Sequence, residues 1–353
     1  MGRAGFSYCP ARTDPHRRPD KLLSDAGTEA MNMNSPYATT LPVMILLTAA
    51  GAVLLFEVYV LGRWLWLKFH RKTKPPVRCF HLLIHSLVLT GLGCVLYAAL
   101  IEPYWPQITV VRLKTPKLQH TVFRIVQISD LHCDARPRLE PRLPELVNGL
   151  DPDIIVFTGD AVNSLDGLEL FQKTLAAMTA PLGQFAVRGN WDYRITADLF
   201  DGTGFELLPL KAVRLEKDGE AVMVCGIDYH LGRVSQQALG QLDSDTWNVL
   251  LYHSPDLIDY LEHQPVDLFL SGHTHGGQVA LPFYGALVTM SRHGKTYEAG
   301  RYTVGDITLY VNRGIGMCGV GPRVRFCARP EITLFEIYPA DEMLSETDDP
   351  LHK

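Results

Sequence analysis

The sequence predicts an α/β domain that follows two hydrophobic helices. Two apolar stretches near the N-terminus are each long enough to cross a membrane. From about residue 121 onward, short apolar runs typical of buried strands alternate with amphipathic segments, and the last part of the chain consists mainly of strand-like runs. Polar side chains follow several of these runs directly, as expected at the carboxyl ends of strands in an open α/β sheet.

Residues 1–40 are polar and contain four prolines, at positions 10, 15, 19 and 36. They show neither an apolar core nor a regular period, so we expect a flexible N-terminal tail. The first thirty residues differ so much from the rest that Met31 or Met33 is an alternative start of the protein.

The apolar stretches Leu41–Gly62 and Phe80–Ile101 are predicted to be transmembrane helices, within an anchor of residues 41–101. The only charge in the first is Glu57, and the second has none. A signal peptide is the alternative for the first stretch, but no small-residue cleavage site follows it and a second span does. Two buried helices of a soluble core are the other alternative.

Residues 63–79, between the two spans, form a basic loop. Its Lys and Arg residues are Arg63, Lys68, Arg71, Lys72, Lys74 and Arg78, whereas Leu22–Thr40 has none. The positive-inside rule therefore places this loop in the cytoplasm and both termini outside. We expect an integral protein of a bacterial-type inner membrane with its C-terminal domain on the external face. Binding of anionic lipid head groups is a further role for the loop on the same side.

Residues 102–120 contain three prolines and are predicted to be a linker. Leu139–Leu150 and Leu168–Met178 have the period of amphipathic helices, the second capped by Asn163 or Ser164. A short helix is expected at Pro255–Glu262. The later strands are predicted at Gln278–Leu281, Arg301–Val304, Ile307–Val311, Arg323–Phe326 and Ile332–Ile337. Residues 339–353 are expected to be an acidic tail.

Five apolar runs are each followed by candidate metal ligands. The runs are Phe123–Ile128, Ile154–Phe157, Phe185–Val187, Val249–Tyr252 and Leu268–Leu270. The ligands that follow them are Asp130, His132, Asp160, Asn190, His253, His273 and His275. A histidine pair alone is usually structural or merely exposed, but repetition at five strand ends favours a common site. Glycines at positions 159, 189 and 272 directly precede three of the ligands, as tight turns require.

The ligand set contains oxygen and nitrogen donors without a thiolate. Such a set suits Mn, Fe, Zn or Mg better than a soft metal, and Mn is the preferred expectation. Seven ligands are too many for one tetrahedral ion. They suit two divalent ions roughly 3.5 to 4 Å apart that share a bridging carboxylate, an arrangement used for phosphoryl displacement.

In chain order these residues form D-x-H, G-D, G-N, H and G-H-x-H. At these residues the sequence resembles the calcineurin-like metallophosphoesterases, whose pattern is D-x-H, G-D, G-N-H-D/E, H and G-H-x-H. The resemblance covers residues 121–338 and implies a four-layer sandwich of two mixed β-sheets flanked by helices. It also implies the metal assignment: one ion on Asp130, His132 and His275, the other on Asn190, His253 and His273, and Asp160 as the bridge. Asp160, Asn190 and His273 are accordingly the candidate catalytic residues.

Within this superfamily, the stretches GHTHGGQVALPF, VNRGIG and ARPEITLFEI resemble a membrane-anchored branch. That branch includes broad phosphodiesterases and a UDP-2,3-diacylglucosamine pyrophosphatase. One residue departs from the pattern, since Trp191 stands where the motif has His. Indole cannot donate a proton to a leaving group. Either the leaving group departs without a general acid, or His293 or His230 supplies the proton, or Trp191 only packs against the sheet edge or lines an acyl groove.

Arg188, Trp191 and Arg313 are the candidate substrate contacts, because an arginine close to the motifs can clamp a phosphate. Each arginine alone is equally consistent with an ordinary surface residue. Gly314–Gly319 matches G-x-G-x-x-G, but no helix can begin at Val320-Gly321-Pro322, so we interpret it as a glycine-rich loop near the site.

Composition excludes other classes of function. The net charge of -5 and the pI near 6.2 give no sign of nucleic-acid binding. The seven cysteines lack C-x-x-C spacing, so neither a zinc ribbon nor a disulfide framework is indicated.

The sequence thus predicts a membrane-anchored binuclear phosphoesterase that cleaves a phosphodiester or diphosphate bond. Its expected partners are the lipid bilayer and a lipid-linked or nucleotide phosphate substrate, with a UDP-2,3-diacylglucosamine type as the sharpest candidate. That substrate is made on the cytoplasmic side, which conflicts with an external domain. A non-catalytic scaffold or a metal sensor is the alternative; a scaffold should have lost ligands, whereas all seven are present. The oligomeric state is not indicated.

Overall fold

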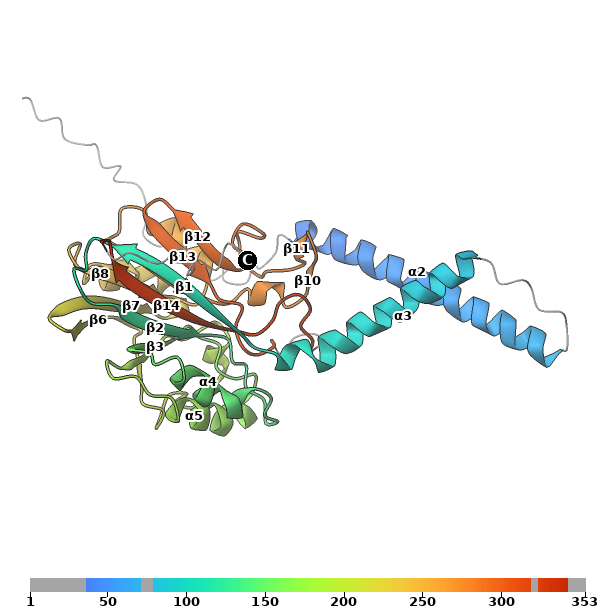
Figure 1. Ribbon diagram of the computed structural model, residues 1–353, viewed down its shortest axis with the longest axis horizontal. Helices are drawn as coiled ribbons and strands as arrows, with labels where there is room; N and C mark the ends of the chain where they lie inside the picture. Colours follow the sequence, from blue (N-terminus) through green and yellow to red (C-terminus); the bar gives the residue numbers. More distant parts are fainter. Residues whose placement is uncertain (1–35, 71–78, 319–322, 342–353) are drawn as a thin grey trace, which may run out of the picture. The chain divides into compact units, whose positions relative to one another are not determined.

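The computed structural model describes residues 36–70, 79–318 and 323–341 (Figure 1). The expected N-terminal tail, the centre of the basic loop and most of the acidic tail lie outside these residues. So do both alternative start positions and the residues Val320-Gly321-Pro322.

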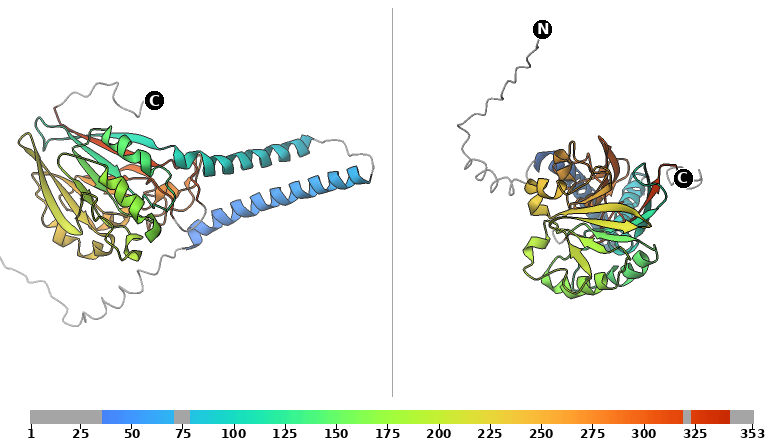
Figure 2. Two further views of the ribbon diagram at one scale, coloured as in Figure 1. Left: turned by 90° about the horizontal axis from the view of Figure 1, so that it is seen from below. Right: turned by 90° about the vertical axis from the view of Figure 1, so that its left-hand side faces the viewer.

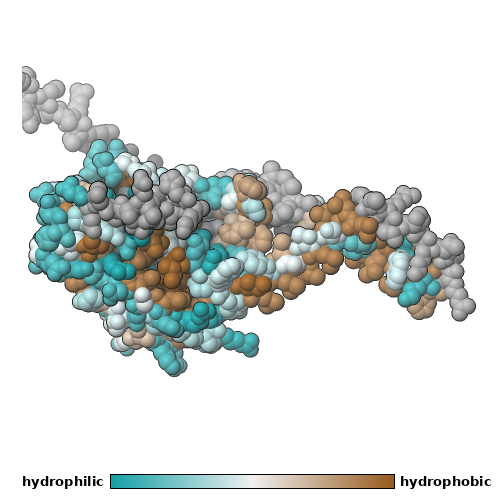
Figure 3. All heavy atoms as spheres, in the orientation of Figure 1, coloured by the Kyte–Doolittle hydropathy of each residue, from teal (hydrophilic) through white to brown (hydrophobic). Residues whose placement is uncertain are grey.

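Two long helices cover the predicted spans, α2 (Pro36–Phe69) and α3 (Cys79–Leu100). The stretches Ala50–Phe69 and Leu82–Tyr104 are long and apolar enough to cross a membrane, and only 6% of each is buried. Their exposed apolar side chains form a hydrophobic surface along both helices (Figure 3). This exposure distinguishes them from buried helices of a soluble core. Glu57 and His85 join the two helices through a 2.6 Å contact between Oε1 and Nδ1.

The first sheet has six strands in the order β1-β14-β2-β3-β4-β5. Its members are β1 (Gln107–Thr115), β14 (Glu331–Pro339), β2 (Phe123–Ile128), β3 (Ile154–Phe157), β4 (Gln184–Ala186) and β5 (Phe205–Leu207). Only the β14–β2 pair is antiparallel, so the sheet is mixed.

The second sheet has the order β12-β13-β9-β8-β7-β6 and is also mixed. Its members are β12 (Gly300–Val304), β13 (Ile307–Val311), β9 (Leu268–Ser271), β8 (Trp247–Leu251), β7 (Glu220–Ile227) and β6 (Leu210–Lys217). A small hairpin of β10 (Ala280–Leu281) and β11 (Gly285–Ala286) lies outside both sheets.

Alternating side chains explain why the two sheets stack into four layers (Figures 1 and 2). On β3, Ile154 and Val156 face the core between the sheets, whereas Ile155 and Phe157 face α4 (Leu143–Asn148) and α5 (Leu168–Ala176). On the second sheet, α6 (Gln236–Leu239) and the 3₁₀ helix η6 (Pro255–Tyr260) cover the outer face. Because both faces of the central strands are buried, their sequences read as continuous apolar runs. The predicted four-layer sandwich is confirmed.

Several local predictions need correction. The helix expected at Leu139–Leu150 is a 3₁₀ turn, η2 (Glu140–Arg142), followed by the short α4, because Pro141 and Pro144 interrupt it. The helix α5 has Gly167 at its N-cap, and neither Asn163 nor Ser164 caps it. The strand expected at Arg323–Phe326 is absent from the described part of the chain, where Phe326 forms only an isolated bridge with Val279.

The predicted linker 102–120 was also wrong. Residues 107–115 form β1, whose nine residues pair in parallel with β14 at the edge of the first sheet. The prolines at positions 103, 106 and 116 flank this strand, outside the hydrogen-bonded ladder, where proline is tolerated. The folded domain therefore begins well before residue 121.

The segment that follows α3 is bonded directly to the domain. Arg325 donates its backbone N–H to the Ala98 carbonyl at 2.9 Å. The buried carboxylate of Glu102 accepts the backbone N–H groups of Cys327 at 3.0 Å and Ala328 at 2.6 Å. The ring of Tyr97 packs edge-on against Phe326 with centroids 6.2 Å apart. The end of α3 is therefore joined to the segment 325–328 by backbone and side-chain contacts.

We predict that Glu102→Ala lowers the free energy of unfolding by about 2–4 kcal/mol, because the buried N–H of Ala328 and the partly buried N–H of Cys327 lose their acceptor. Thermal or denaturant unfolding of the detergent-solubilised chain measures the change. Glu216→Ala removes an exposed carboxylate and serves as the control, with an expected change within about 0.5 kcal/mol. Equal stability of both variants would contradict this role of Glu102.

Candidate metal centre

The structure brings all seven predicted ligands together where the two sheets meet. Asp130 and His132 follow β2, Asp160 follows β3 and Asn190 follows β4 in the first sheet; His253 follows β8 in the second. His273 and His275 follow β9 in the second sheet. Parallel strands present their carboxyl ends at one edge, so short loops suffice to gather residues that are far apart in sequence.

One group of donors consists of Asp130, His132 and His275, whose ligand atoms all lie within 4.8 Å of one another. The two Nε2 atoms of His132 and His275 are 3.2 Å apart, and His275 Nε2 is 3.3 Å from Asp130 Oδ1. These are the three residues that the resemblance assigns to one ion.

A second group of donors surrounds Asp160. Its Oδ2 lies 3.3 Å from His253 Nε2 and 3.5 Å from His132 Nε2, so it lies between the two groups, where a bridging carboxylate would be needed. His273 Nδ1 is 3.1 Å from His253 Nε2. The side-chain oxygen of Asn190 is buried without a hydrogen-bond partner in the described part of the chain.

The backbone of the site is unusual. Asp130, His132, Asp160, His273 and His275 all have positive φ, between 42° and 72°. Non-glycine residues rarely adopt this conformation, which costs of order 1 kcal/mol or more each. Five of the seven ligands therefore occupy conformations that only the surrounding fold maintains.

Two of the glycines that precede ligands are required by close packing. A Cβ at Gly189 would collide with Asp160 Oδ1, and a Cβ at Gly272 would collide with Asp130 Oδ2 and Ser129 Oγ. Each glycine thus lets the backbone of one ligand loop pass directly beside the carboxylate of another.

Neighbouring groups orient the ligands. Ser129 donates its hydroxyl to Asp130 at 2.5 Å. His253 Nδ1 lies 2.7 Å from the Thr158 carbonyl, so that nitrogen carries the proton and Nε2 is directed to Asp160. The buried carboxylate of Asp192 accepts the N–H groups of Gly189, Asp160 and Ala161 at 2.7–2.9 Å and joins the loops after β3 and β4. Sequence reasoning assigned no role to Ser129 or Asp192.

Arg325 is the main functional residue that the sequence did not reveal. Its guanidinium is fully buried and donates to the carbonyls of Arg313, Gly314, Gly316 and Ala328. One of its nitrogens lies 3.4 Å from His275 Nδ1. Burial lowers its pKa to about 9. The only available signal was a charged residue within an apolar run, which is equally typical of an edge strand.

The glycine-rich segment lies against the site, as predicted. Ile315 and Gly316 donate backbone N–H groups to the carbonyls of Ser129 at 2.9 Å and Asp130 at 2.7 Å. Asn163 donates to the carbonyls of His132 at 2.8 Å and Met317 at 3.2 Å. It therefore joins loops around the site instead of capping a helix.

Trp191 is buried beside the ligands. Its ring packs edge-on against His132 with centroids 5.6 Å apart, and its Nε1–H donates to the Asn163 carbonyl at 3.2 Å. Arg194 stacks on the other ring face at 3.7 Å. The indole N–H is thus already occupied and is not directed at a leaving group.

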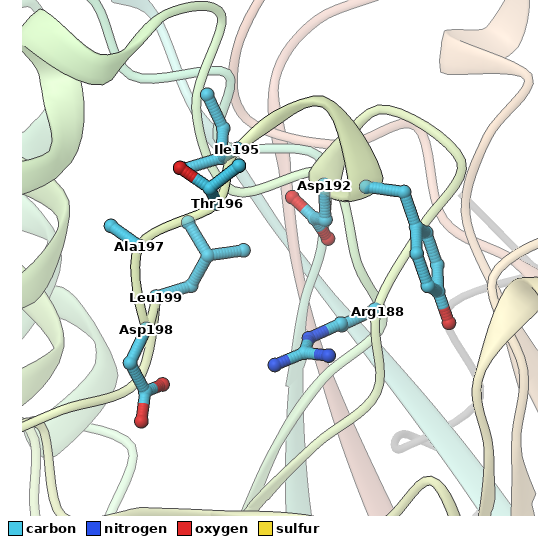
Figure 4. A pocket seen from close by; sticks show the side chains of 8 residues that line it. Arg188, Asp192, Ile195, Thr196, Ala197, Asp198 and Leu199 are labelled. Carbon is cyan, nitrogen blue, oxygen red and sulfur yellow. The ribbon is translucent and has the colours of Figure 1, made fainter.

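The two candidate arginines differ in their surroundings. Arg313 pairs with Glu331, with Nη2 3.2 Å from Oε1 and Nε 3.2 Å from Oε2, so two of its nitrogens already have a partner within the protein. Arg188 lines a pocket of about 280 Å³, into which its guanidinium extends (Figure 4). In the described part of the chain this guanidinium has no hydrogen-bond or ion-pair partner. The other lining residues are Asp192, Tyr193, Ile195, Thr196, Ala197, Asp198 and Leu199.

Burial and neighbouring charges shift the protonation of the ligands. Burial lowers the pKa of His132 to about 4. Burial also opposes the charged form of His253, but the Asp160 carboxylate outweighs it and raises the pKa of His253 to about 10. Against the effect of burial, the histidines lower the pKa values of Asp130 and Asp160. Both carboxylates are therefore ionised at neutral pH.

These residues fit a pair of divalent metal ions. The donors are carboxylate and amide oxygens and imidazole nitrogens, the set that Mn, Fe and Zn accept. The unpartnered Asn190 oxygen and the crowded imidazole nitrogens of His132 and His275 are explained by cations between them.

Comparison with known proteins agrees with this site. A family model for calcineurin-like phosphoesterases matches residues 123–277. The uncharacterized metallophosphoesterase YkuE of Bacillus subtilis is 35% identical over 264 residues, which cover 70% of this chain and 91% of that protein. The chain belongs to the calcineurin-like phosphoesterase family. It is thus a metal-dependent hydrolase of phosphoric esters, and the family holds a dinuclear metal site.

Two further relatives within this family carry informative names. The UDP-2,3-diacylglucosamine pyrophosphatase LpxG of Chlamydia trachomatis is 27% identical over 301 residues, covering 66% of this chain and 90% of that protein. A transmembrane protein with metallophosphoesterase domain of Danio rerio is 29% identical over 281 residues, covering 72% of this chain and 62% of that protein.

We predict that the full chain binds about two divalent ions and that Asp160→Ala loses bound metal and turnover together, because a bridging ligand serves both ions. Metal content by mass spectrometry after desalting measures this. Asp166→Ala, which removes an exposed carboxylate, should retain both ions. Wild-type protein with a single ion, or an active Asp160→Ala variant, would contradict the binuclear assignment.

Metal binding should also release a proton. His253 is protonated at neutral pH in the metal-free protein because its pKa is raised, and a metal ion must displace that proton from Nε2. The apparent affinity should therefore rise with pH, by up to about tenfold per pH unit below the raised pKa. Titration calorimetry with Mn²⁺ in buffers of different ionisation enthalpy measures the proton count. A pH-independent affinity would contradict this protonation state.

Proposed function

We propose that this protein is a membrane-anchored binuclear phosphoesterase that cleaves a diphosphate or phosphodiester bond of a lipid-linked substrate. The observation that carries the proposal is that the segment 325–328, which supports the cluster of metal-ligand candidates, is bonded to the end of the apolar helix α3 and to Glu102 after it. Anchoring raises the encounter rate with a substrate confined to the same membrane. The relatives named as a lipid-precursor pyrophosphatase and as a transmembrane protein support it.

Each part of the site has a role in this reaction. Two bound ions supply Lewis acidity to the phosphoryl group and an activated water. Asp160, between the two groups of donors, orients both halves of the site. His273 is the most exposed of the ligand imidazoles and is therefore the ligand that substrate can reach, and Asn190 contributes the amide oxygen. We assign Arg188, in its pocket, to the phosphate that does not react.

The expected leaving group follows from Trp191. General acid catalysis is worth roughly 10²- to 10⁴-fold, and the indole N–H, already bonded to the Asn163 carbonyl, cannot supply it. A phosphate leaving group departs as an anion without a proton, whereas an alkyl alcohol does not. This favours a diphosphate linkage such as that of UDP-2,3-diacylglucosamine.

The decisive experiment is hydrolysis of a substrate panel by the manganese-loaded full chain in detergent or vesicles. Lipid-linked diphosphates, lipid-linked phosphodiesters and soluble phosphodiesters are compared, and Asp160→Ala is the inactive control. Turnover of soluble esters alone would contradict the lipid-linked substrate. No turnover of any ester with two ions bound would favour a metal sensor.

Trp191→His should reduce the difference in hydrolysis rate between diphosphate or aryl esters and alkyl phosphodiesters. We expect wild type to favour diphosphate and aryl esters, and the variant to accelerate alkyl phosphodiesters by up to about 10²-fold. Trp191→Phe is the matched control, since it keeps an aromatic ring without a titratable group. Similar wild-type rates on alkyl and aryl esters would show that another residue, such as His230 or His293, donates the proton.

The side of the membrane is a separate prediction. The basic residues between the spans support a catalytic domain outside the cytoplasm. A reporter fused after Lys353 should therefore be active only on the external side. A cytoplasmic signal would reverse the topology and bring the domain to the side where UDP-2,3-diacylglucosamine is made.

A further inference from the structure

The turn of the β10–β11 hairpin exposes two aromatic side chains. Phe283 is fully exposed and Tyr284 is nearly half exposed. Phe283 also has φ of 65°, a conformation that non-glycine residues rarely adopt. The hairpin thus holds a large apolar ring in solvent without a packing partner, and neither the metal ligands nor the sheets require this arrangement.

The base of this hairpin is joined to the end of the predicted membrane anchor. Ala280 donates its N–H to the Phe326 carbonyl at 2.8 Å, and Phe326 donates to the Gln278 carbonyl at 3.0 Å. The Phe326 ring in turn packs on Tyr97 in the last turn of α3. Tyr104 and Trp105, which follow this helix, are exposed. Exposed Tyr and Trp at the end of an apolar helix are typical of the membrane interface.

The other end of the same segment reaches the metal site. Met290, also exposed and at positive φ, has its carbonyl 3.2 Å from His273 Nε2. Lys295, which follows Met290 in the chain, lies 4.2 Å from the Tyr284 ring, donates to the carbonyls of Tyr284 and Ala286, and pairs with Glu298. Exposed aromatic and apolar side chains beside a membrane helix are the pattern of segments that insert at a membrane surface.

We propose that Phe283, Tyr284 and Met290 form a lipid-docking surface that contacts the bilayer beside α3. The occupant is the membrane itself, because the hairpin is continuous with the anchor through Phe326 and Tyr97. Docking here brings His273, a partly exposed metal-ligand candidate, to the level of the head groups. A lipid-linked phosphate then reaches the metal site with its acyl chains still in the bilayer. The docking itself does not depend on the reaction; only the kinetic test below rests on the proposed function.

Photocrosslinking tests the contact directly. The full chain is reconstituted in vesicles of phosphatidylcholine and phosphatidylglycerol, with p-benzoylphenylalanine in place of Phe283. The control carries it in place of Val234, an exposed apolar residue of the 3₁₀ helix η5 (Tyr229–Val234). We expect lipid adducts at position 283 and none above background at position 234. Equal lipid labelling at both positions, or adducts at 283 to protein alone, would overturn the proposal.

Kinetic measurements test whether docking at this surface speeds the hydrolysis of a lipid substrate. Phe283→Ser combined with Tyr284→Ser should lower kcat/KM for CDP-diacylglycerol in these vesicles about tenfold, since two apolar side chains leave the interface. Hydrolysis of soluble bis(p-nitrophenyl) phosphate should be unchanged, and Val234→Ser should alter neither rate. Equal losses on both substrates would show that the hairpin only supports the metal site, and no loss on either would also contradict docking. If wild type does not cleave the lipid, the proposed function fails while photocrosslinking still decides the docking.

Discussion

The structure depends on the burial of two ionised carboxylates beside each other. Asp130 and Asp160 are almost fully buried, and within the described residues neither forms an ion pair with lysine or arginine. Their negative charge is opposed only by histidines, hydrogen bonds and the nearby Arg325, an arrangement that is costly without cations. The same constraint explains the positive φ of five ligands. Their loops must turn back sharply to direct short side chains at one point.

The sequence predicted the elements in which a single physical requirement, such as burial on both faces, determines the residue types. Strands such as β3 and β9 are buried on both faces, so their apolar runs are unambiguous, and the ligands follow them directly. By contrast, β1 alternates polar and apolar residues between prolines, and its pairing with β14, more than 200 residues away, has no local signal. Arg325 was unpredictable for a related reason: its partners are backbone carbonyls, which every sequence possesses. The pairing of Arg313 with Glu331 was likewise not predictable, because Glu331 lies in another strand.

The anchor and the metal site share one supporting segment. Residues 325–328 donate backbone N–H groups to the Ala98 carbonyl and the Glu102 carboxylate on one side, while the side chain of Arg325 extends to the glycine-rich loop and to His275 on the other. Packed interiors transmit small displacements instead of absorbing them. The end of α3 is therefore part of the support of a metal ligand, and a truncation after the second span would remove more than a tether. A truncation that also removes Glu102 would leave the buried N–H of Ala328 and the N–H of Cys327 without an acceptor beside the site.

The identity of the leaving group connects the proposed reaction with the proposed membrane-bound substrate. With Trp191 in the place of the usual acid, the proposed function favours a departing group that is stable as an anion, namely a phosphate attached to either the nucleotide or the lipid. In the described part of the chain the guanidinium of Arg188 has no hydrogen-bond or ion-pair partner, which is why the proposed function assigns it to that anion. In the proposed function, the apolar remainder of the substrate needs an apolar environment, which the pocket of Arg188 does not offer. The exposed residues Phe283 and Met290 lie on the chain segment whose Met290 carbonyl contacts His273. In the proposed function, charge and apolar surface would therefore be recognised on different elements around one metal centre. A substrate that combines a diphosphate with acyl chains would meet both requirements, whereas a soluble diester would lack the apolar part.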